Sequence, residues 1–259
     1  MDTENGVISP GGVGYDINCG VRVIRTNLKS SDLTGNKELL TNKIYSAVPC
    51  GVGSKSDVKV NSSTLKKVLL EGSSWAVRNG FGWEEDLEYT EENGRLDGAD
   101  PEIVSGRALE RGHEQLGTLG SGNHFVEIQK VTDIFDENAA NTLGLESDAV
   151  TIMIHTGSRG FGHQVCGDWI KNLRGAKKKF NIDIPDEQLI YAPLDSKEGQ
   201  DYLSAMRAAA NFAWANRQII LSRVRDSFAD VFGKSAESLG MHLIYDVAHN
   251  IAKVEDHIV

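Results

Sequence analysis

The chain has 259 residues and a formal net charge of -10 at pH 7, which excludes a uniformly basic nucleic-acid coat but leaves room for a local basic strip. No apolar stretch approaches the ~20 residues that cross a bilayer, and the N-terminus lacks the basic and apolar regions of a signal peptide. With three irregularly spaced cysteines, Cys19, Cys50 and Cys166, the composition predicts a cytoplasmic protein without membrane spans.

The N-terminal part of the chain is predicted to contain one strand and two helices. Residues 20–25 alternate in the manner of a half-buried strand, and residues 32–45 and 61–78 have helical periodicity. Residues 81–106 contain an acidic run and an Asn-Gly turn. They are expected to form a solvent-exposed loop.

The rest of the chain alternates between apolar, β-branched runs and long amphipathic segments. The elements expected there are strands at 125–131, 149–154 and 241–245 and helices at 161–180 and 200–231. In the last helix Trp214 and Phe228 are expected in the core. Because no repeat or linker divides these elements, residues 1–259 are predicted to form one α+β domain, with mixed β-sheets flanked by helices.

Asp16 and Cys19 are the first candidate ligands for a metal. They lie three residues apart in a glycine-flanked turn, where both side chains can face one point. A carboxylate beside a thiolate suits a divalent cation. The same short motif, taken alone, also describes a buried cysteine next to a carboxylate that caps a turn.

Three histidines follow a common pattern, because each lies in a turn at the end of a predicted strand. His124 follows the glycines of residues 117–122, whose N–H groups can surround phosphate oxygens. His155 directly follows a predicted strand, and His249 lies in the segment after the strand predicted at 241–245. A single histidine of this kind is typical of a structural residue that pairs with a carbonyl, but together with Asp16 and Cys19 the three predict a site for one or two divalent metals.

Polar residues next to these histidines indicate anion binding. Asn123 can donate to a phosphate, and Arg159 follows a Thr-Gly-Ser turn that leads into a helix. The alternative for Arg159 is a surface ion pair. Asp246 is expected to orient His249 or Lys253 through a hydrogen bond.

These residues lie in longer motifs that resemble the signatures of RtcB, the GTP-dependent tRNA-splicing RNA ligase family. The resemblance extends in order from about residue 7 to residue 257. The motifs are Pro-Gly-Gly-Val-Gly-Tyr-Asp-Ile-Asn-Cys-Gly-Val-Arg from residue 10, Leu-Gly-Ser-Gly-Asn-His-Phe from residue 119, His-Thr-Gly-Ser-Arg-Gly from residue 155 and Asp-Val-Ala-His-Asn from residue 246. The resemblance implies joining of RNA 2',3'-cyclic phosphate or 3'-phosphate ends to 5'-hydroxyl ends.

The resemblance also implies ligands. Two Mn2+ ions would share Cys19, with Asp16 and His124 completing one site and His155 and His249 the other. GTP would bind with Asn123 and Asn250 near its phosphates and Glu127 near its guanine; the implied nucleotide-binding residues are Asn123, His124, Phe125, Val126, Glu127, His249 and Asn250.

RNA is the implied substrate, as tRNA halves or broken RNA, and an archease-like activating protein is an implied partner. The candidate contacts to RNA phosphates are Arg22, Arg111 and Arg159. Because the chain is acidic overall, any RNA groove is expected to be local.

One family feature does not occur in this sequence. Members of the family carry a nucleophilic histidine in a His-Arg-Lys-Gly-Ala-Thr segment, and the context of His257 differs from it. No catalytic nucleophile is therefore predicted, and the chain is expected to be a central portion of the family fold, incomplete at both ends. The alternatives are a catalytically inactive metal- and nucleotide-binding fragment and a Zn2+ hydrolase with Glu127 or Glu114 as base, although the His-Glu-x-x-His arrangement does not occur.

Overall fold

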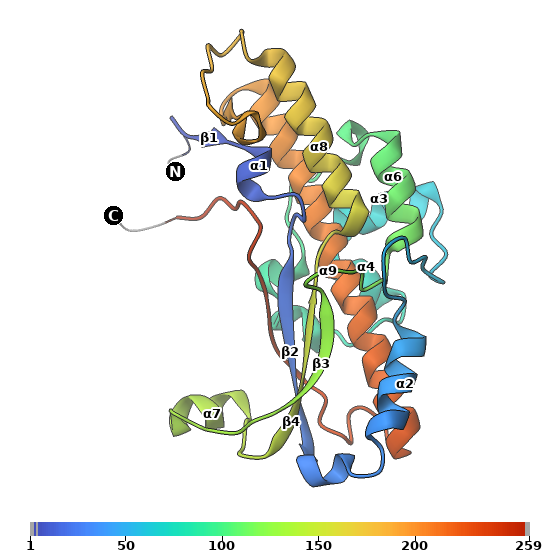
Figure 1. Cartoon of the computed structure of the whole chain (residues 1–259). Helices are drawn as coiled ribbons and strands as arrows, with labels where there is room; N and C mark the ends of the chain where they lie inside the picture. The colour runs from blue at the N-terminus through green and yellow to red at the C-terminus, as the bar shows by residue number, and fades with distance from the viewer. Residues whose placement is uncertain (1–2, 4, 257–259) are drawn as a thin grey trace.

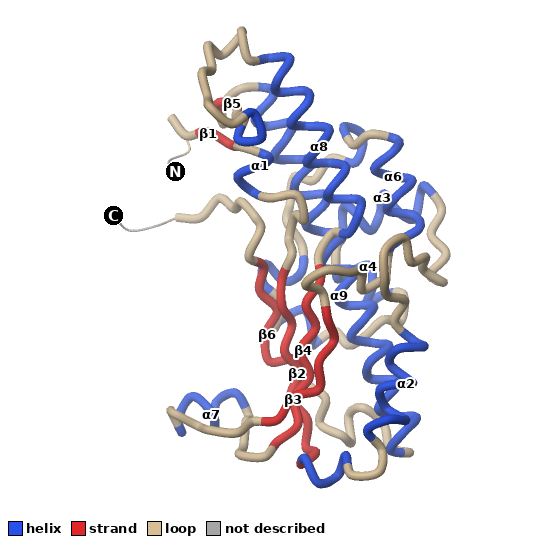
Figure 2. Tube along the Cα trace, viewed as in Figure 1, coloured by secondary structure: helices blue, strands red, loops and turns tan. Residues whose placement is uncertain are grey.

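The computed structural model describes residue 3 and residues 5–256, so His257 lies outside the described residues. Within that part the strands form a two-stranded and a four-stranded sheet, and the pairs of named strands are all antiparallel (Figure 2). The strands are β1 Val7–Ile8, β2 Gly20–Lys29, β3 Phe125–Lys130, β4 Ala149–Thr156, β5 Ala192–Pro193 and β6 Leu243–Ala248. The predicted α+β class is confirmed.

Helices cover one face of the four-stranded sheet and extend beyond its end (Figure 1). The α-helices are α1 Pro10–Val13, α2 Lys37–Ala47, α3 Ser62–Glu71, α4 Ser73–Arg78, α5 Glu85–Glu88, α6 Gly106–Gln115, α7 Glu137–Leu143, α8 Arg159–Ala176 and α9 Lys197–Phe232. The short 3-10 helices are η1 Ser30–Leu33, η2 Glu91–Gly94, η3 Pro101–Ile103 and η4 Glu187–Leu189.

Helix α9 is the central element of the molecule. Ser196 caps its first turn through the amide of Gly199, and Gly233 ends it in the left-handed conformation. Its middle is buried on all sides, as a helix between layers must be. One half packs among α3, α4 and α8, and the other lies between α2 and the sheet. Trp214 and Phe228 are fully buried, as the apolar stripe predicts.

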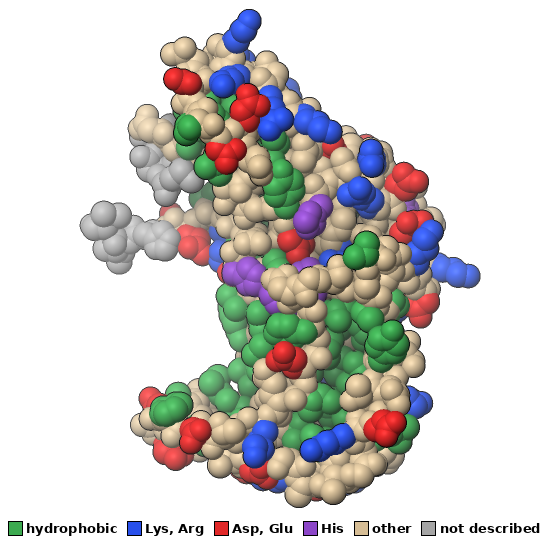
Figure 3. Space-filling view, in the orientation of Figure 1, with side chains coloured by type: hydrophobic (Ala, Val, Ile, Leu, Met, Phe, Trp, Pro, Cys, Tyr) green, Lys and Arg blue, Asp and Glu red, His purple; other side chains and the backbone are tan. Residues whose placement is uncertain are grey.

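The four-stranded sheet has the order β3-β4-β2-β6. The predicted alternation along β2 is present, but its inward face includes Arg22 together with Ile24. Arg22 lies directly opposite Asp246 of β6 in the register. The opposite face carries partly exposed apolar side chains, including Tyr245 and Val247. Figure 3 shows hydrophobic side chains gathered over a concave region of this side of the molecule.

The predicted helix at 61–78 is divided into α3 and α4 at Gly72. This residue has a φ of 55°, and a Cβ there would lie 2.1 Å from the carbonyl oxygen of Gly94. Only glycine combines that backbone conformation with so close an approach. The helix expected at 32–45 begins later, at Lys37, because residues 30–33 form η1 instead.

Most of residues 81–106 are exposed or partly exposed, as predicted, but the segment contains α5, η2 and η3, and a few of its side chains are buried. Asp86 is 1% exposed and binds Arg225 of α9 through two hydrogen bonds of 2.7 Å. Thr90 is buried and forms a bridge with Asp246. The acidic composition of this segment predicts hydrated side chains, but in the fold the buried guanidinium of Arg225 pairs with the Asp86 carboxylate. Within the described residues, no helix is long and apolar enough to cross a membrane.

Candidate metal centre

Ligand-type side chains converge at one end of the four-stranded sheet. There β2 begins and β4 and β6 end, because Gly20 is paired with both Thr156 and Ala248. Strand β3 begins in the same row, with Phe125 opposite His155. The antiparallel register therefore brings four turns, far apart in sequence, to the same edge.

Asp16 and Cys19 come from the turn between α1 and β2. The Cys19 amide donates to the Asp16 carbonyl at 2.9 Å, and Asn18 between them has a φ of 53°. Asparagine tolerates this left-handed conformation better than most residues. The tight turn places the carboxylate and the thiol beside each other, as the three-residue spacing predicts.

The histidines complete the cluster. Nε2 of His124 lies 2.8 Å from Oδ2 of Asp16 and 3.4 Å from Sγ of Cys19. Nε2 of His155 lies 3.2 Å from the same sulfur and 3.4 Å from Nε2 of His249. The donor atoms of Cys19, His155 and His249 all lie within 4.8 Å of one another, and so do those of Asp16, Cys19 and His124. The two triads share one sulfur atom.

The fold shifts the pKa values of two imidazoles in the cluster downward and the pKa of the thiol upward. Burial, together with His124 and His249, lowers the pKa of His155, and burial and Arg217 lower the pKa of His249. Both rings are therefore neutral at about pH 7, the form that binds metals. Burial and the Asp16 carboxylate raise the pKa of Cys19 to about 12, so a nearby cation is needed to hold the thiolate.

The Asp16 carboxylate is held in its ionised form. Burial opposes its ionisation, but the hydrogen bond with His124 and the nearby charges of His163 and Arg159 lower its pKa below the ordinary value. The other ring nitrogen of His124, Nδ1, lies 3.2 Å from the carbonyl oxygen of Leu119. The hydrogen bond with Asp16 uses Nε2, so binding a cation through Nε2 would require the proton on Nδ1, where the Leu119 carbonyl can accept it.

A cleft of about 520 Å³ opens over the cluster. Its lining residues are Asp16, Cys19, Val52, Gly53, Gln115, Ser121, Asn123, His124, Arg159, Gly160, His163, His249 and Asn250. Histidine side chains gather in this part of the surface, above the hydrophobic concave region (Figure 3). The cleft combines metal-ligand types with amide and guanidinium donors.

Arg159 is the principal cation of the cleft. Its Nη1 lies 3.1 Å from Nδ1 of His124, while its Nε is buried without a hydrogen-bond partner. A Cβ on Gly120 would come within 2.0 Å of the Arg159 guanidinium carbon. Glycine is therefore required for the guanidinium to lie against this loop, and its unpaired N–H is suited to an anion.

The residues implied for nucleotide binding do not all reach the cleft. Asn123 and Asn250 line it, and the ring of Phe125 packs edge-on against His155 at 5.3 Å between centroids. Glu127 is exposed further along β3 and accepts a hydrogen bond from Gln129. The Val126 side chain packs against the hydrophobic core and not into the cleft.

The three arginines expected at RNA occupy different environments. Arg159 lines the cleft, and Arg111 lies beside it, with Nη1 3.5 Å from the carbonyl of Gly160. Arg22 is fully buried and donates to Asp246 at 2.8 Å and to Gln218. An RNA phosphate cannot reach it, so the sequence-based assignment of Arg22 is corrected.

The expected partner of Asp246 is also corrected. Its carboxylate is fully buried between Arg22 and Arg217 and contacts neither His249 nor Lys253. The Lys253 ammonium instead lies 2.7 Å from Glu91. Asp246 is on the inward face of β6, so its side chain points away from the cleft.

Sequence reasoning missed three residues at or under the site. His163 and Gln115 line the cleft. His163 lies four residues after Arg159 on α8, a spacing that places both on one helix face and could have indicated it. Arg217 lies beneath the cluster within a helix whose pattern is that of a core segment, and no motif distinguishes it.

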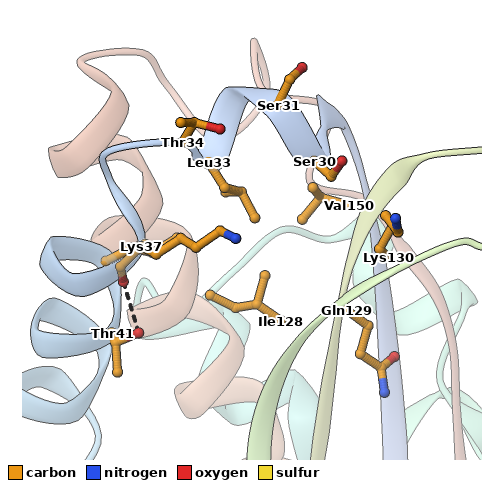
Figure 4. Close-up of a pocket in the computed structure, with 11 residues that line it drawn as sticks. Ser30, Ser31, Leu33, Thr34, Lys37, Thr41, Ile128, Gln129, Lys130 and Val150 are labelled. Atoms are coloured by element: carbon orange, nitrogen blue, oxygen red, sulfur yellow. Dashed lines mark hydrogen bonds between the residues drawn. The ribbon is translucent and has the colours of Figure 1, made fainter.

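A larger cleft elsewhere lacks this chemistry. It has a volume of about 620 Å³ and lies between η1, α2 and the β3 side of the sheet. Figure 4 shows Lys37 pointing into it between Leu33 and Ile128, with the hydroxyls of Ser31 and Thr34 at its rim. None of its lining residues, all from the described part of the chain, is a histidine, cysteine, aspartate or glutamate. It is not the candidate site.

The fold and the site define an α+β protein with two triads of metal-ligand-type side chains that share one thiol, beside a cleft lined by amide and guanidinium groups. A family model described as tRNA-splicing ligase RtcB matches residues 1–259, and the chain belongs to this family. It is similar to the tRNA-splicing ligases RtcB of Methanococcus maripaludis and Archaeoglobus fulgidus, with 54% identity to each over 259 residues. The corresponding protein of Thermococcus kodakarensis is 53% identical over 259 residues.

These alignments cover 100% of this chain and 54% of each of the three relatives. The chain thus spans about half the length of the curated relatives it matches.

Proposed function

We propose that this chain forms the metal centre and the nucleotide-phosphate site of a GTP-dependent RNA ligase of the RtcB type. The reaction would join RNA ends bearing a 2',3'-cyclic phosphate or 3'-phosphate to 5'-hydroxyl ends. The observation that carries the proposal is the Cys19 sulfur atom common to two ligand triads. A cytoplasmic setting, RNA as substrate and an archease-like activating protein are parts of the same proposal.

The donor set fits two divalent cations. Cys19, Asp16 and His124 would hold one ion, and Cys19, His155 and His249 the other. Thiolate, carboxylate and imidazole suit Mn2+ or Zn2+; general affinity favours Zn2+, so availability and geometry would select Mn2+. Bound there, the cations would supply charge neutralisation for phosphate groups.

The residues around the ligands support phosphate binding. Arg159 has a buried, unpaired Nε, and the Asn123 and Asn250 amides line the same cleft. These groups would orient the phosphates of GTP or of an RNA end, and Arg111 at the rim would add positive charge. Placing Glu127 near the guanine, with Phe125 beside the metal ligand His155, follows from the family resemblance.

The direct test is metal stoichiometry after Mn2+ loading, compared between the natural chain and Cys19→Ala. We expect two Mn2+ per natural chain and loss of most of this metal in the variant, because one sulfur serves both triads. Cys166→Ala is the matched control, since Cys166 is also buried but donates to the Pro10 carbonyl, away from the cluster. Elemental analysis of the gel-filtered proteins measures the result.

GTP binding by equilibrium dialysis, with and without Mn2+, tests the nucleotide part of the proposal. We expect binding that depends on Mn2+. Unchanged metal content in Cys19→Ala would rule out the shared-thiol centre, and metal binding without GTP binding would restrict the proposal to the metals.

A further inference from the structure

Beneath the metal centre, the fully buried guanidinium of Arg217 in the middle of α9 contacts three separate segments. Nη1 donates to the carbonyls of Asn18 at 2.7 Å and Thr156 at 2.9 Å. Nη2 donates to the side-chain oxygen of Asn18 at 2.9 Å and to Asp246 at 2.8 Å, and Nε donates to Asp246 at 2.7 Å. All five N–H groups of the guanidinium are thus satisfied.

Each acceptor of Arg217 is close in sequence to a proposed metal ligand. Asn18 precedes Cys19, and Thr156 follows His155. Asp246 lies on the strand that leads to His249. The contact is so close that a Cβ on Gly20 would lie 3.1 Å from the Arg217 guanidinium carbon.

The neighbouring side chain, Asn216, connects the remaining ligand segment. Its Oδ1 accepts from the amides of Gly117 at 2.6 Å and Thr118 at 3.1 Å, in the loop that leads to His124. Its Nδ2 donates to the carbonyls of Thr118 at 3.1 Å and Gly157 at 3.3 Å. Asn216 therefore ties the His124 loop to the segment after His155.

We infer that Asn216 and Arg217 are positioning residues that set the separation of the ligands in the proposed two-metal centre. Neither side chain lines the cleft; they act through the backbone of the segments that carry the ligands. The inference rests on the proposed function, since it requires the metal centre. The five donor atoms come from four separate turns and must lie within a few ångströms of one another. Hydrogen bonds from one helix hold all four turns in fixed relative positions.

Lysine cannot replace Arg217 in this role. Its ammonium is a point charge with three donors, whereas the planar guanidinium makes five directed bonds at once. Arg217→Lys retains the charge opposite Asp246 but loses at least two of the bonds to Asn18, Thr156 and Asp246. The ligand turns would then shift relative to one another while the helix remains.

Cobalt(II) is the probe for the test, because its thiolate complexes absorb light and report on ligand geometry. Titration of the full chain gives the number of ions bound, their affinities and the sulfur-to-cobalt absorption. We expect Arg217→Lys to weaken cobalt binding about tenfold or more, the usual range for groups that orient metal ligands, and to reduce the sulfur-to-cobalt band. Asn216→Asp keeps the acceptor for the Gly117 and Thr118 amides but sets a carboxylate oxygen against the carbonyls of Thr118 and Gly157, and it is the second variant if Arg217→Lys does not fold.

Arg225→Lys is the matched control. Arg225 is a buried arginine of the same helix, and it donates to Asp86 and to the Met241 carbonyl, which belong to no ligand turn. We expect it to lower stability towards urea but to leave cobalt affinity and the absorption band unchanged. Equal losses in Arg225→Lys and Arg217→Lys would overturn the inference, as would natural affinity and spectrum in both Arg217→Lys and Asn216→Asp.

The number of cobalt ions that the natural chain binds distinguishes failure of the positioning role from failure of the proposed function. If the natural chain binds fewer than two cobalt ions, the two-metal centre is wrong and the inference falls with it. If it binds two and the variants are unchanged, only the positioning role is wrong.

Discussion

At the scale of single residues, the site depends on close approaches that only particular side chains permit. Arg159 lines the cleft because Gly120 leaves room for its guanidinium, whose Nε is buried without a hydrogen-bond partner. Gly120 has a φ of 98°, so both its missing side chain and its backbone conformation are needed. The position of the guanidinium in the cleft is therefore determined by a glycine as much as by the arginine.

Gly120→Ala tests this dependence. The new methyl group would overlap the guanidinium, so we expect Arg159 to be displaced and Mn2+-dependent GTP binding to weaken about tenfold, the effect of losing one charged hydrogen bond. Gly122→Ala is the control: Gly122 also has a positive φ, of 78°, but no atom lies within 4 Å of its Cβ position. Equal affinities of the two variants, measured by equilibrium dialysis, would argue against the steric role of Gly120.

At the scale of elements, buried ion pairs join α9 to the segments around it. Arg22 and Arg217 meet Asp246, and Arg225 meets Asp86 of α5. Such pairs contribute little net stability compared with an apolar core, but removing one partner leaves an uncompensated buried charge. They restrict how the sheet, α5 and α9 can pack, and of these pairs the one between Arg217 and Asp246 lies at the base of the proposed metal centre.

The substitution Asp86→Asn should show how the contribution of the Asp86–Arg225 pair to the free energy of unfolding depends on pH. Burial raises the pKa of Asp86, but the hydrogen bonds and charge of Arg225 outweigh burial and lower the pKa below its ordinary value of 3.8. The pair therefore contributes full stability above about pH 4, and the contribution is lost as pH falls through the folded-state pKa. We expect Asp86→Asn to lower the free energy of unfolding by about 3–5 kcal/mol at neutral pH.

Urea titrations of both proteins between pH 7 and pH 3 measure this difference, which should shrink on acidification. Asp32→Asn is a control at an exposed acidic position. A difference between Asp86→Asn and the natural chain that does not change with pH would contradict the assigned role of the carboxylate.

At the scale of the whole molecule, the four-stranded sheet has one covered face and one open face. Tyr245 and Val247 on the open face are 48% and 47% exposed, next to partly exposed Val21 and Val23 of the paired strand. Exposed apolar surfaces are typical of sites that bind apolar molecules or other chains. The open face adjoins the metal centre, because Val21 is paired with His155.

Val247→Thr should reduce binding of an environment-sensitive apolar dye to this face. Threonine keeps the branched shape that suits a strand but lowers the apolar area. Leu39→Gln on α2 is the control, since Leu39 is 50% exposed on a helix away from this face. Dye fluorescence titrations at equal protein concentration measure the effect; equal decreases in both variants would mean that the open face is not a distinct apolar surface.

Local sequence pattern was sufficient for much of the fold. The strand at 149–154 and the helix at 200–231 lie within β4 and α9, because a continuous apolar, β-branched run and a long run with period 3.6 specify their own structure. The expectation of a solvated loop at 81–106 fails at Asp86, which is buried, because its pairing with Arg225 joins positions 139 residues apart. No local signal records such a pairing.

The sequence by itself determined the α+β class, the family and the ligand types, because each is encoded in contiguous motifs and periodic runs. Only the tertiary structure decided that one sulfur lies within two ligand triads, that Arg22 is buried with Asp246, and that Arg217 and Asn216 connect the ligand turns. These facts depend on antiparallel register and on the packing of α9 against the sheet end. Both bring together residues from distant parts of the chain, which a local reading cannot place.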